Sequence, residues 1–350
     1  MSGHPVGDPL ARFRYSQMGP VELLLGDAHQ VLSAMPDGSV DCVVTSPPFW
    51  GLRDYTVTGQ YGLESCVEEY VDRLVAVFAQ LRRVLKPSGT AWLNLGDCYT
   101  SPERHTTAYA PNSRKEQHAS ARLLPAKNLV GVPWRTAFAL QADRWVLRNA
   151  VVWAKTNPMP ESVRDRLSCT YELFFLLTPS SRYWFDLDPI RQPLKRPEAA
   201  DGTLTIGGSR KGTSGGIGAT ARRRGTSKYG AGAVQARAGA PNLTPTGSRH
   251  TAAHPRGKNP GDVWPMATRP YRGAHVAPFP IDLPMRAIAA GCPPGGVVLD
   301  PFSGAATTGL AALRLGRRYI GIDINASFHD EAITRLTPHL DSQNRSNPHT

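Results

Sequence analysis

A serine, two prolines and a phenylalanine, Ser46 to Phe49, stand where a short apolar run ends. The run, Val40 to Val44, is predicted to be a buried strand. Proline cannot donate to a sheet ladder and is tolerated in a helix only within the first turn, so we expect the chain to leave the sheet in a stiff, extended loop. That loop presents the Ser46 hydroxyl, a backbone carbonyl on each proline and the Phe49 ring. A flat aromatic base could stack on the ring while its exocyclic amine donates to the hydroxyl and a carbonyl, which indicates chemistry on an amino nitrogen.

A second set of residues that could do chemistry surrounds a loop of small residues near the other end of the chain. Val297 to Asp300 and Tyr319 to Ile322 are predicted strands, and the small and apolar residues Ala305 to Leu315 form a predicted helix between them. These segments make a complete βαβ unit. Asp323 lies 23 residues after Asp300, close to the spacing at which an acid reaches the hydroxyls of a nucleotide ribose.

The loop of that unit, residues 300–309, argues against the usual NAD-binding turn. It lacks the G-x-G-x-x-G pattern, and Pro301 and Phe302 crowd the place where a pyrophosphate would press on backbone N–H groups. An adenosine ligand without a phosphate fits this loop better.

Polar side chains follow the predicted strands at widely separated places in the sequence. In an open parallel sheet the carboxyl ends of the strands share one edge, and ligands bind in the crevice there. We therefore expect one pocket to be lined by Asp27, Ser46, Asp300 and Asp323.

The elements that must position these residues alternate between strand and helix, which is typical of a doubly wound α/β sheet. Between Val67 and Leu85 apolar residues recur on one helical face, and the segment 87–89 is expected to end that helix. A β-hairpin is predicted from Tyr171 to Leu177 and Tyr183 to Phe185. The remaining predicted elements are strands at 21–25, 91–95 and 146–153 and helices at 28–35 and 133–143, and regular structure of unassigned type is predicted at 283–290.

Both motif regions resemble those of the β class of amino-methylating DNA methyltransferases. Thr45 to Phe49 is similar to the catalytic tetrapeptide of that family, and Asp300 to Gly304, followed by Gly321 to Asp323, is similar to its S-adenosylmethionine loop. The order of catalytic motif, variable recognition region and cofactor loop also resembles the β class. The resemblance runs from about Val21 to Asn325, apart from a basic insert. It implies a Rossmann-like, doubly wound sheet that is circularly permuted, with the catalytic half first and the cofactor half last.

The resemblance also implies a role for individual residues. The catalytic loop would consist of Ser46, Pro47, Pro48 and Phe49. The residues that would hold S-adenosylmethionine are Asp300, Phe302, Gly304 and Thr307 at its methionine end and wall, Asp323 at its ribose, Asp27 at its adenine amine, Thr45 beside it, and Phe279 closing the site. The family usually has a second glycine where this chain has Ala306, whose methyl group is tolerable if φ there is negative.

Some of these residues have a simpler role open to them. Asp27 and Asp300 could cap the helices that follow their strands, and Phe279 and Phe302 could belong to the core. Asp97, after another predicted strand, either forms a turn or accepts a hydrogen bond from the target amine or from the catalytic serine.

The reaction that the resemblance implies is direct methyl transfer to the amine of a base rotated out of the duplex. Hydrogen bonds from the amine to the Ser46 hydroxyl and the Pro47 carbonyl would aim the nitrogen lone pair at the methyl group, while Phe49 stacks on the base. In the resembled family Ser-Pro-Pro-Phe/Tyr occurs more often with cytosine N4 methylation, and Asp-Pro-Pro-Tyr with adenine N6. We therefore expect cytosine N4, with adenine N6 as the alternative.

Other activities compete less well with this hypothesis. Methylation at cytosine C5 needs a cysteine nucleophile usually preceded by proline, and the sequence contains no Pro-Cys dipeptide. An RNA or protein N-methyltransferase on the same scaffold, or a DNA-binding protein without activity, stays open.

The composition favours a nucleic-acid partner, expected to be double-stranded DNA. The net charge is +12 and the pI is about 9.7, and residues 191–258 alone hold 13 Lys or Arg against two acids. Residues 202–239 contain 11 glycines and the run Arg222, Arg223 and Arg224, and little apolar content. We expect this flexible segment to bind DNA and to become ordered only on a polyanion.

The predicted organisation is an N-terminal tail (1–20), a catalytic half (21–190), a basic target-recognition region (191–265), a cofactor-binding half (266–340) and a C-terminal tail (341–350). Five scattered cysteines fit a reducing cytosol and argue against a disulfide framework or a zinc site. No apolar run approaches the length of a membrane span, so we expect a cytoplasmic protein associated with DNA. The recognition sequence, a cognate restriction endonuclease and a homodimer are left open.

Overall fold

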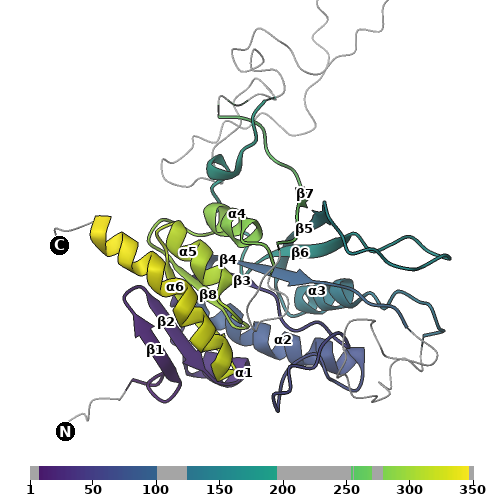
Figure 1. Cartoon of the computed structure of the whole chain (residues 1–350), viewed down its shortest axis with the longest axis horizontal. Coiled ribbons are helices and arrows are strands. Elements are labelled where there is room, and N and C mark those ends of the chain that lie inside the picture. Colours follow the sequence, from purple (N-terminus) through teal and green to yellow (C-terminus); the bar gives the residue numbers. More distant parts are fainter. Residues whose placement is uncertain (1–7, 101–123, 195–253, 255, 270–278, 347–350) are drawn as a thin grey trace, which may run out of the picture. The chain divides into compact units, whose positions relative to one another are not determined.

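A computed structural model describes residues 8–100, 124–194, 254, 256–269 and 279–346 (Figure 1). The chain divides into two compact units, Met1–Trp184 with Gly261–Thr350, and Phe185–Pro260. The described part of the second unit contains the short 3₁₀ helix Asp188–Ile190 and a β-bridge between Gln192 and Lys258. The segment 202–239, with its three consecutive arginines, lies outside the described residues. The sheet and the α-helices belong to the first unit.

A single mixed sheet forms the centre of this unit, with the strand order β1-β2-β9-β8-β3-β4-β6-β5-β7. Strands β2, β9, β8, β3 and β4 run parallel to one another. Strand β1 is antiparallel to β2, β6 is antiparallel to both β4 and β5, and β7 is parallel to β5. The bounds are β1 Arg14–Met18, β2 Val21–Leu25, β3 Val40–Thr45, β4 Leu85–Leu95, β5 Val146–Lys155, β6 Tyr171–Thr178, β7 Val263–Met266, β8 Val297–Asp300 and β9 Arg318–Asp323.

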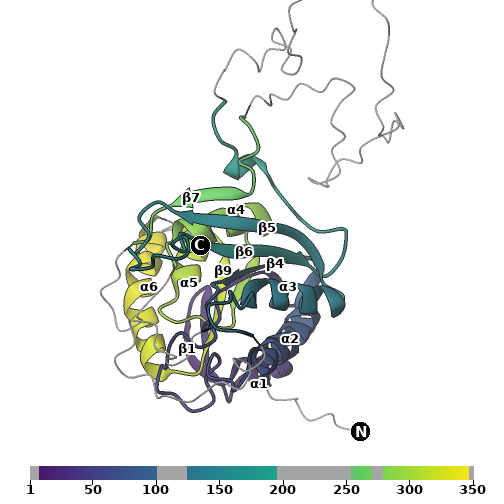
Figure 2. The same ribbon diagram turned by 90° about the vertical axis from the view of Figure 1, so that its right-hand side faces the viewer.

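Six α-helices in the described residues cover the two faces of the sheet in two groups. Helices α1, α2 and α3 contact one another in turn, as do α4, α5 and α6. Figure 2 shows α2 and α3 on one side of the sheet and α5 and α6 on the other. The bounds are α1 Ala28–Ala34, α2 Val67–Val84, α3 Val132–Ala142, α4 Asp282–Gly291, α5 Thr307–Arg314 and α6 Ala326–Ser346. Within the described ranges, none of the helices combines the length and the apolar character needed to cross a membrane.

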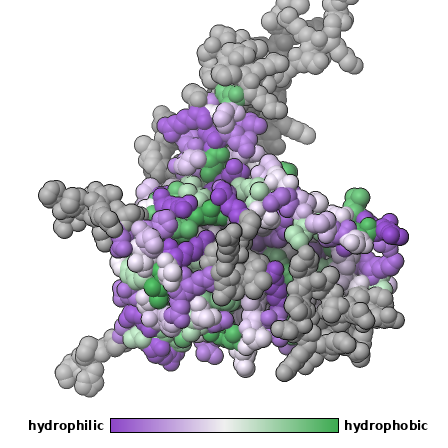
Figure 3. All heavy atoms as spheres, in the orientation of Figure 1, coloured by the Kyte–Doolittle hydropathy of each residue, from purple (hydrophilic) through white to green (hydrophobic). Residues whose placement is uncertain are grey.

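Side chains that alternate in direction along β4 pack against both faces of the sheet. Leu93 and Leu95 belong to the large core cluster, together with Phe78 of α2. Trp92 points to the opposite face, where its ring lies 5.4 Å from that of Phe174. There the backbone of α4 comes so close that a Cβ added at Gly291 would lie 2.6 Å from Trp92 Nε1. On the surface drawn in Figure 3, hydrophobic residues form small groups among hydrophilic ones.

Most of these elements match the sequence predictions, but the junction of α2 and β4 differs. Helix α2 ends at Val84, one residue early, and β4 begins at once with Leu85, so Pro87 and Gly89 lie in the strand instead of separating it from the helix. Pro87 is tolerated because it lies where the pairing of β4 with β3 shifts register, between the pair Val40–Leu85 and the pair Cys42–Thr90.

The predicted hairpin of residues 171–177 and 183–185 is wrong. Strand β6 pairs instead with β5 and β4, and residues 183–185 form no strand.

The expected tails at the two ends of the chain are also shorter than predicted. Arg14–Met18 forms β1 against β2, and α6 continues to Ser346.

Candidate active site

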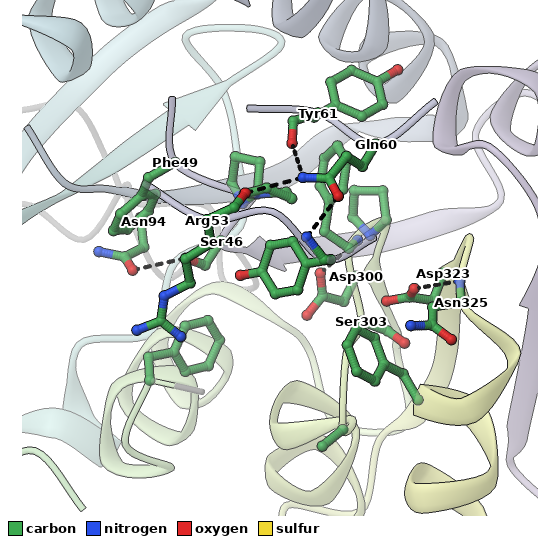
Figure 4. Close-up of a pocket in the computed structure, with 18 of the residues that line it drawn as sticks. Ser46, Phe49, Arg53, Gln60, Tyr61, Asn94, Asp300, Ser303, Asp323 and Asn325 are labelled. Carbon is green, nitrogen blue, oxygen red and sulfur yellow. Dashed lines mark hydrogen bonds between the residues drawn. The ribbon is translucent and has the colours of Figure 1, made fainter. Parts of the chain in front are cut away.

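A cavity of about 490 Å³ lies at the carboxyl edge of the sheet (Figure 4). Its lining includes Asp27 after β2, Ser46 after β3, Asp300 at the end of β8 and Asp323 at the end of β9. These four strands are neighbours and run parallel, in the order β2-β9-β8-β3. The structure therefore brings the four predicted strand-end residues into one pocket.

A buried hydrogen-bond cluster joins the two distant halves of the sequence. The Thr45 hydroxyl donates to Asp300 Oδ1 at 2.7 Å, across 255 positions, and the Thr308 hydroxyl donates to Oδ2 at 2.8 Å. The Phe302 N–H adds a bond to Oδ1 at 3.1 Å. Burial raises the pKa of Asp300 to about 6, although the three donors act in the opposite direction. Thr45 does not line the cavity; it fixes the carboxylate that does.

Asp323 and Asp27 occupy the neighbouring strand ends. Asp323 accepts from the Gly304 N–H at 2.8 Å through one oxygen and from the Asn325 N–H at 2.9 Å through the other. Burial raises the pKa of Asp323. Asp27 caps α1 by accepting from the Gln30 N–H at 3.0 Å. It also lines the cavity, so it has both the structural role and the place in the pocket that the sequence suggested. Asp300 does not cap α5.

The residue that caps α5 is Ala306, and its φ is +53°. The condition of a negative φ at this position is therefore not met. A left-handed conformation costs a non-glycine residue about 1 kcal/mol, which is a physical reason for a glycine at this position. Gly304, with φ +48°, supplies the other left-handed residue of the loop and does not itself line the cavity.

Aromatic rings form the walls of the cavity. Phe302 and Phe279 line it, and the Phe302 ring meets that of Tyr61 edge to face at 5.1 Å. Phe49 lies over the backbone just after β4, so closely that a Cβ added at Gly96 would be 2.7 Å from its ring. Thr307 also lines the cavity, and its hydroxyl accepts from Arg335 Nη1 at 2.8 Å.

The Ser46 hydroxyl is oriented by a chain of side chains that no motif in the sequence indicated. It donates to Asn94 Oδ1 at 3.0 Å (Figure 4). The Asn94 amide donates in turn to Glu172 Oε2 at 3.0 Å and to the Leu173 carbonyl at 3.2 Å. Lys155 donates to Glu172 Oε1 at 2.6 Å. Because Asn94 is only 1% exposed and its amide is held twice, its oxygen is fixed toward Ser46.

The two proline carbonyls of the loop differ in their surroundings. The Tyr70 hydroxyl donates to the Pro48 carbonyl at 2.9 Å. The Pro47 carbonyl accepts no hydrogen bond from the described residues. Pro47 and Pro48 both line the cavity, so the Pro47 carbonyl is the one available to a ligand.

Asp97 is not brought to the cavity. Its Oδ1 accepts from the N–H groups of Cys98 at 2.9 Å, Gly131 at 2.9 Å and Val132 at 3.0 Å. The last two bonds secure the start of α3, whose cap residue, Gly131, has no side chain to do so. Asp97 therefore has the turn-forming role, and Asn94 is the residue of this strand that reaches Ser46.

A family model and two known proteins match most of this sequence. The family model described as "DNA methylase" (N6_N4_Mtase) matches residues 40–334. Type II methyltransferase M.Cfr9I of Citrobacter freundii is 37% identical over 335 residues, covering 94% of this chain and 92% of its own. Type II methyltransferase M.SmaI of Serratia marcescens is 35% identical over 326 residues, covering 92% of each chain.

Two solved structures share the fold. The PvuII DNA methyltransferase, titled cytosine-N4-specific, aligns with a TM-score of 0.55 and 17% identity over 92% of this chain and 91% of its own. A putative DNA modification methylase from Thermus thermophilus, solved with S-adenosyl-L-methionine, aligns with a TM-score of 0.52 and 21% identity over 91% of this chain and 93% of its own.

Proposed function

The chain belongs to the N6/N4 DNA methylase family, and from this we propose that it methylates the N4 amine of a cytosine rotated out of double-stranded DNA. Its methyl donor is S-adenosylmethionine. The observation that carries the proposal is the Thr45–Asp300 hydrogen bond, because it holds the serine loop and the Asp300 loop on one cavity.

The chemistry of the lining residues fits this donor. One end of the cavity presents the carboxylates of Asp27, Asp300 and Asp323, which form no ion pair with the described residues. Carboxylates accept from hydroxyls and amines and favour a positive charge, but they repel a phosphate. Such a lining suits a nucleoside that bears a sulfonium.

Individual residues are assigned to the donor on that basis. Asp323 accepts from its ribose hydroxyls, and Asp27 accepts from its adenine amine. Asp300, Phe302 and Thr307 hold the methionine end, and Phe279 closes the cavity beside it. When bound, the donor supplies a methyl group on an electron-poor sulfur.

Ser46 and Pro47 hold the target amine. Since the Ser46 O–H donates to Asn94, its oxygen lone pairs remain for an N–H of the base. The Pro47 carbonyl takes the second N–H. With both hydrogens held, the nitrogen lone pair is turned out of the plane of the ring, and Phe49 fixes that plane by stacking. On transfer the N–CH₃ bond would form as the S–CH₃ bond breaks, with the sulfur keeping that bond's electrons as a thioether, and the nitrogen would release one hydrogen as a proton to water.

The choice of cytosine rests on the serine that begins the Ser-Pro-Pro-Phe motif. In the resembled family that serine accompanies cytosine N4 methylation more often than adenine N6 methylation. The adenine alternative predicts N6-methyladenine from the same site, so the product distinguishes the two.

The arrangement of the halves is part of the proposal. The serine loop follows β3, early in the chain, and the donor loop follows β8, late in the chain, which supports a circular permutation of the methyltransferase sheet. We assign the basic segment between them, with Arg222, Arg223 and Arg224, to the DNA backbone on its charge alone.

The experiment incubates the full chain with methyl-labelled S-adenosylmethionine and duplex DNA, then digests the DNA to nucleosides. The expected labelled product is N4-methylcytosine. Label in N6-methyladenine overturns the choice of base, and label in RNA or polypeptide but not in DNA overturns the substrate.

A further inference from the structure

Arg53 is a cation of the cavity that has no part in the proposed mechanism. Of the three cationic side chains in the described lining, Lys155 is paired with Glu172 at 2.6 Å and Arg269 with Asp282 at 2.7 Å. The Arg53 guanidinium forms no hydrogen bond or ion pair with any described residue, and its Nη1 is buried. Because a buried donor without a partner costs about 1–3 kcal/mol, a ligand that draws the guanidinium onto its own acceptors would be bound more tightly.

The loop that carries Arg53 is well fixed. The Arg53 carbonyl accepts from Gln60 Nε2 at 3.0 Å, and the Tyr55 N–H donates to Gln60 Oε1 at 2.7 Å. The Gly51 N–H donates to the Gly62 carbonyl at 2.8 Å. The guanidinium therefore stands on a backbone that is already ordered, so little ordering is required when a ligand arrives.

The direction of the side chain indicates which ligand it meets. In Figure 4 the Arg53 guanidinium extends into the side of the cavity where Ser46 and Asn94 lie. Asp323 and Asn325 lie on the other side in that view. Arg53 thus faces the place assigned to the target base more directly than the ribose end of the donor.

We propose that Arg53 reads the target base, donating two N–H groups to N3 and O2 of cytosine while Ser46 accepts from N4. The inference rests on the proposed function. Along its Watson–Crick edge cytosine presents the amine and then two acceptors, N3 and O2, which match the planar fork of an arginine. Adenine presents its amine, one acceptor at N1 and then a C–H group. An adenine in the cavity would therefore leave one guanidinium N–H without a partner.

The test compares cytosine with 3-deazacytosine, which keeps the amine but has a C–H group in place of N3. Both are placed at the target position of a duplex whose recognition site has first been read from the DNA of an expressing, methylation-free host. The unaltered chain should lose about 10- to 100-fold in kcat/KM on the analogue, the range of a bidentate base contact. Arg53→Met should be slower on cytosine but lose less than about threefold on changing to the analogue, because the contact is already absent.

Two further variants sharpen the test. Arg53→Lys keeps the charge without the fork and should retain part of the discrimination. Arg148→Met, at an exposed arginine outside the cavity, should discriminate as the unaltered chain does.

Equal losses on the analogue for the unaltered chain and Arg53→Met overturn the role of Arg53 alone. With that result, a raised KM for S-adenosylmethionine in the variant would assign Arg53 to the methionine carboxylate, and a raised KM for DNA would assign it to a phosphate. No cytosine methylation by the unaltered chain overturns the proposed function together with this inference.

Discussion

At the scale of single residues, the orientation of one hydroxyl governs the proposed chemistry. Ser46 donates its hydrogen to Asn94, which Glu172 and Lys155 hold in place. The serine is therefore presented as an acceptor, and an amine is a suitable donor for it.

Ser46→Ala is expected to lower kcat by about 100- to 1,000-fold, the loss found when a group that stabilises the transition state is removed. The affinity for S-adenosylmethionine should be unchanged, because the donor residues lie on the Asp27, Asp300 and Asp323 strand ends. Methylation rates and donor binding by calorimetry check both expectations. Ser33→Ala, at an exposed serine of α1, is the matched control. Full activity in Ser46→Ala would contradict its role.

Asn94→Leu is expected to lower kcat by about tenfold while leaving the KM for the donor unaltered, because the serine hydroxyl is no longer oriented. Combining it with Ser46→Ala should add little further loss, since both changes remove the same interaction. Asn149→Leu, at an exposed asparagine of β5, is the control. Losses that multiply in the double variant would show that Asn94 acts independently of Ser46.

The raised pKa of Asp300, about 6 against an ordinary 3.8, predicts a pH dependence of donor binding. A positively charged ligand favours the ionised carboxylate, so affinity should be constant above pH 6 and fall up to tenfold per unit below it. For folding the sign is opposite, because the stability contributed by the protonated form below pH 3.8 is lost as the pH rises to about 6. Calorimetric titration between those values measures the first effect; affinity that stays level through this range would contradict it.

At the scale of elements, the local sequence pattern was sufficient to predict where strands end. It was not sufficient to predict which strands pair with each other. The motifs at Ser46 and Asp300 each follow an apolar run, so their places could be predicted. The Asn94–Glu172 contact depends on β4 pairing with β6, which puts Asn94 opposite Phe174. That register is set by packing between distant segments, and the sequence instead suggested a local hairpin for residues 171–185.

The side chain of Asp97 could also be only partly predicted from the sequence. Its position after a strand was predictable, but the direction in which its carboxylate points depends on the loop leading to α3. Asp97→Ala is expected to cost about 1–2 kcal/mol of unfolding free energy through loss of the bonds to Gly131 and Val132, with kcat within threefold of normal. Urea unfolding and methylation rates measure these effects. Asp97→Asn, which keeps an acceptor oxygen, should be closer to normal; a large fall in kcat at full stability would return Asp97 to the catalytic residues.

At the scale of the whole molecule, the basic segment is the part of the chain assigned to DNA. Its proposed role rests on the charge of residues 191–258, with 13 basic residues against two acids. The composition predicted a DNA partner, but base readout depends on a few placed side chains that composition does not specify.

Replacing residues 202–239 by an uncharged Gly/Ser linker of equal length should weaken DNA binding by at least tenfold and flatten its dependence on salt, because fewer counterions are released. Donor binding should be unaltered. Fluorescence anisotropy across a salt series measures this effect. A version with the same residues in scrambled order is the control for charge without sequence. Unchanged DNA affinity in the linker variant would remove the assigned role.

The central claim is that the serine loop and the donor loop act on one amine in one cavity. The most direct measurement is nucleoside analysis of duplex DNA after incubation with methyl-labelled S-adenosylmethionine, with Ser46→Ala in parallel. We predict N4-methylcytosine from the unaltered chain and a large loss of it from the variant. Equal labelling by both chains, or no labelled amine in the DNA, would contradict the account.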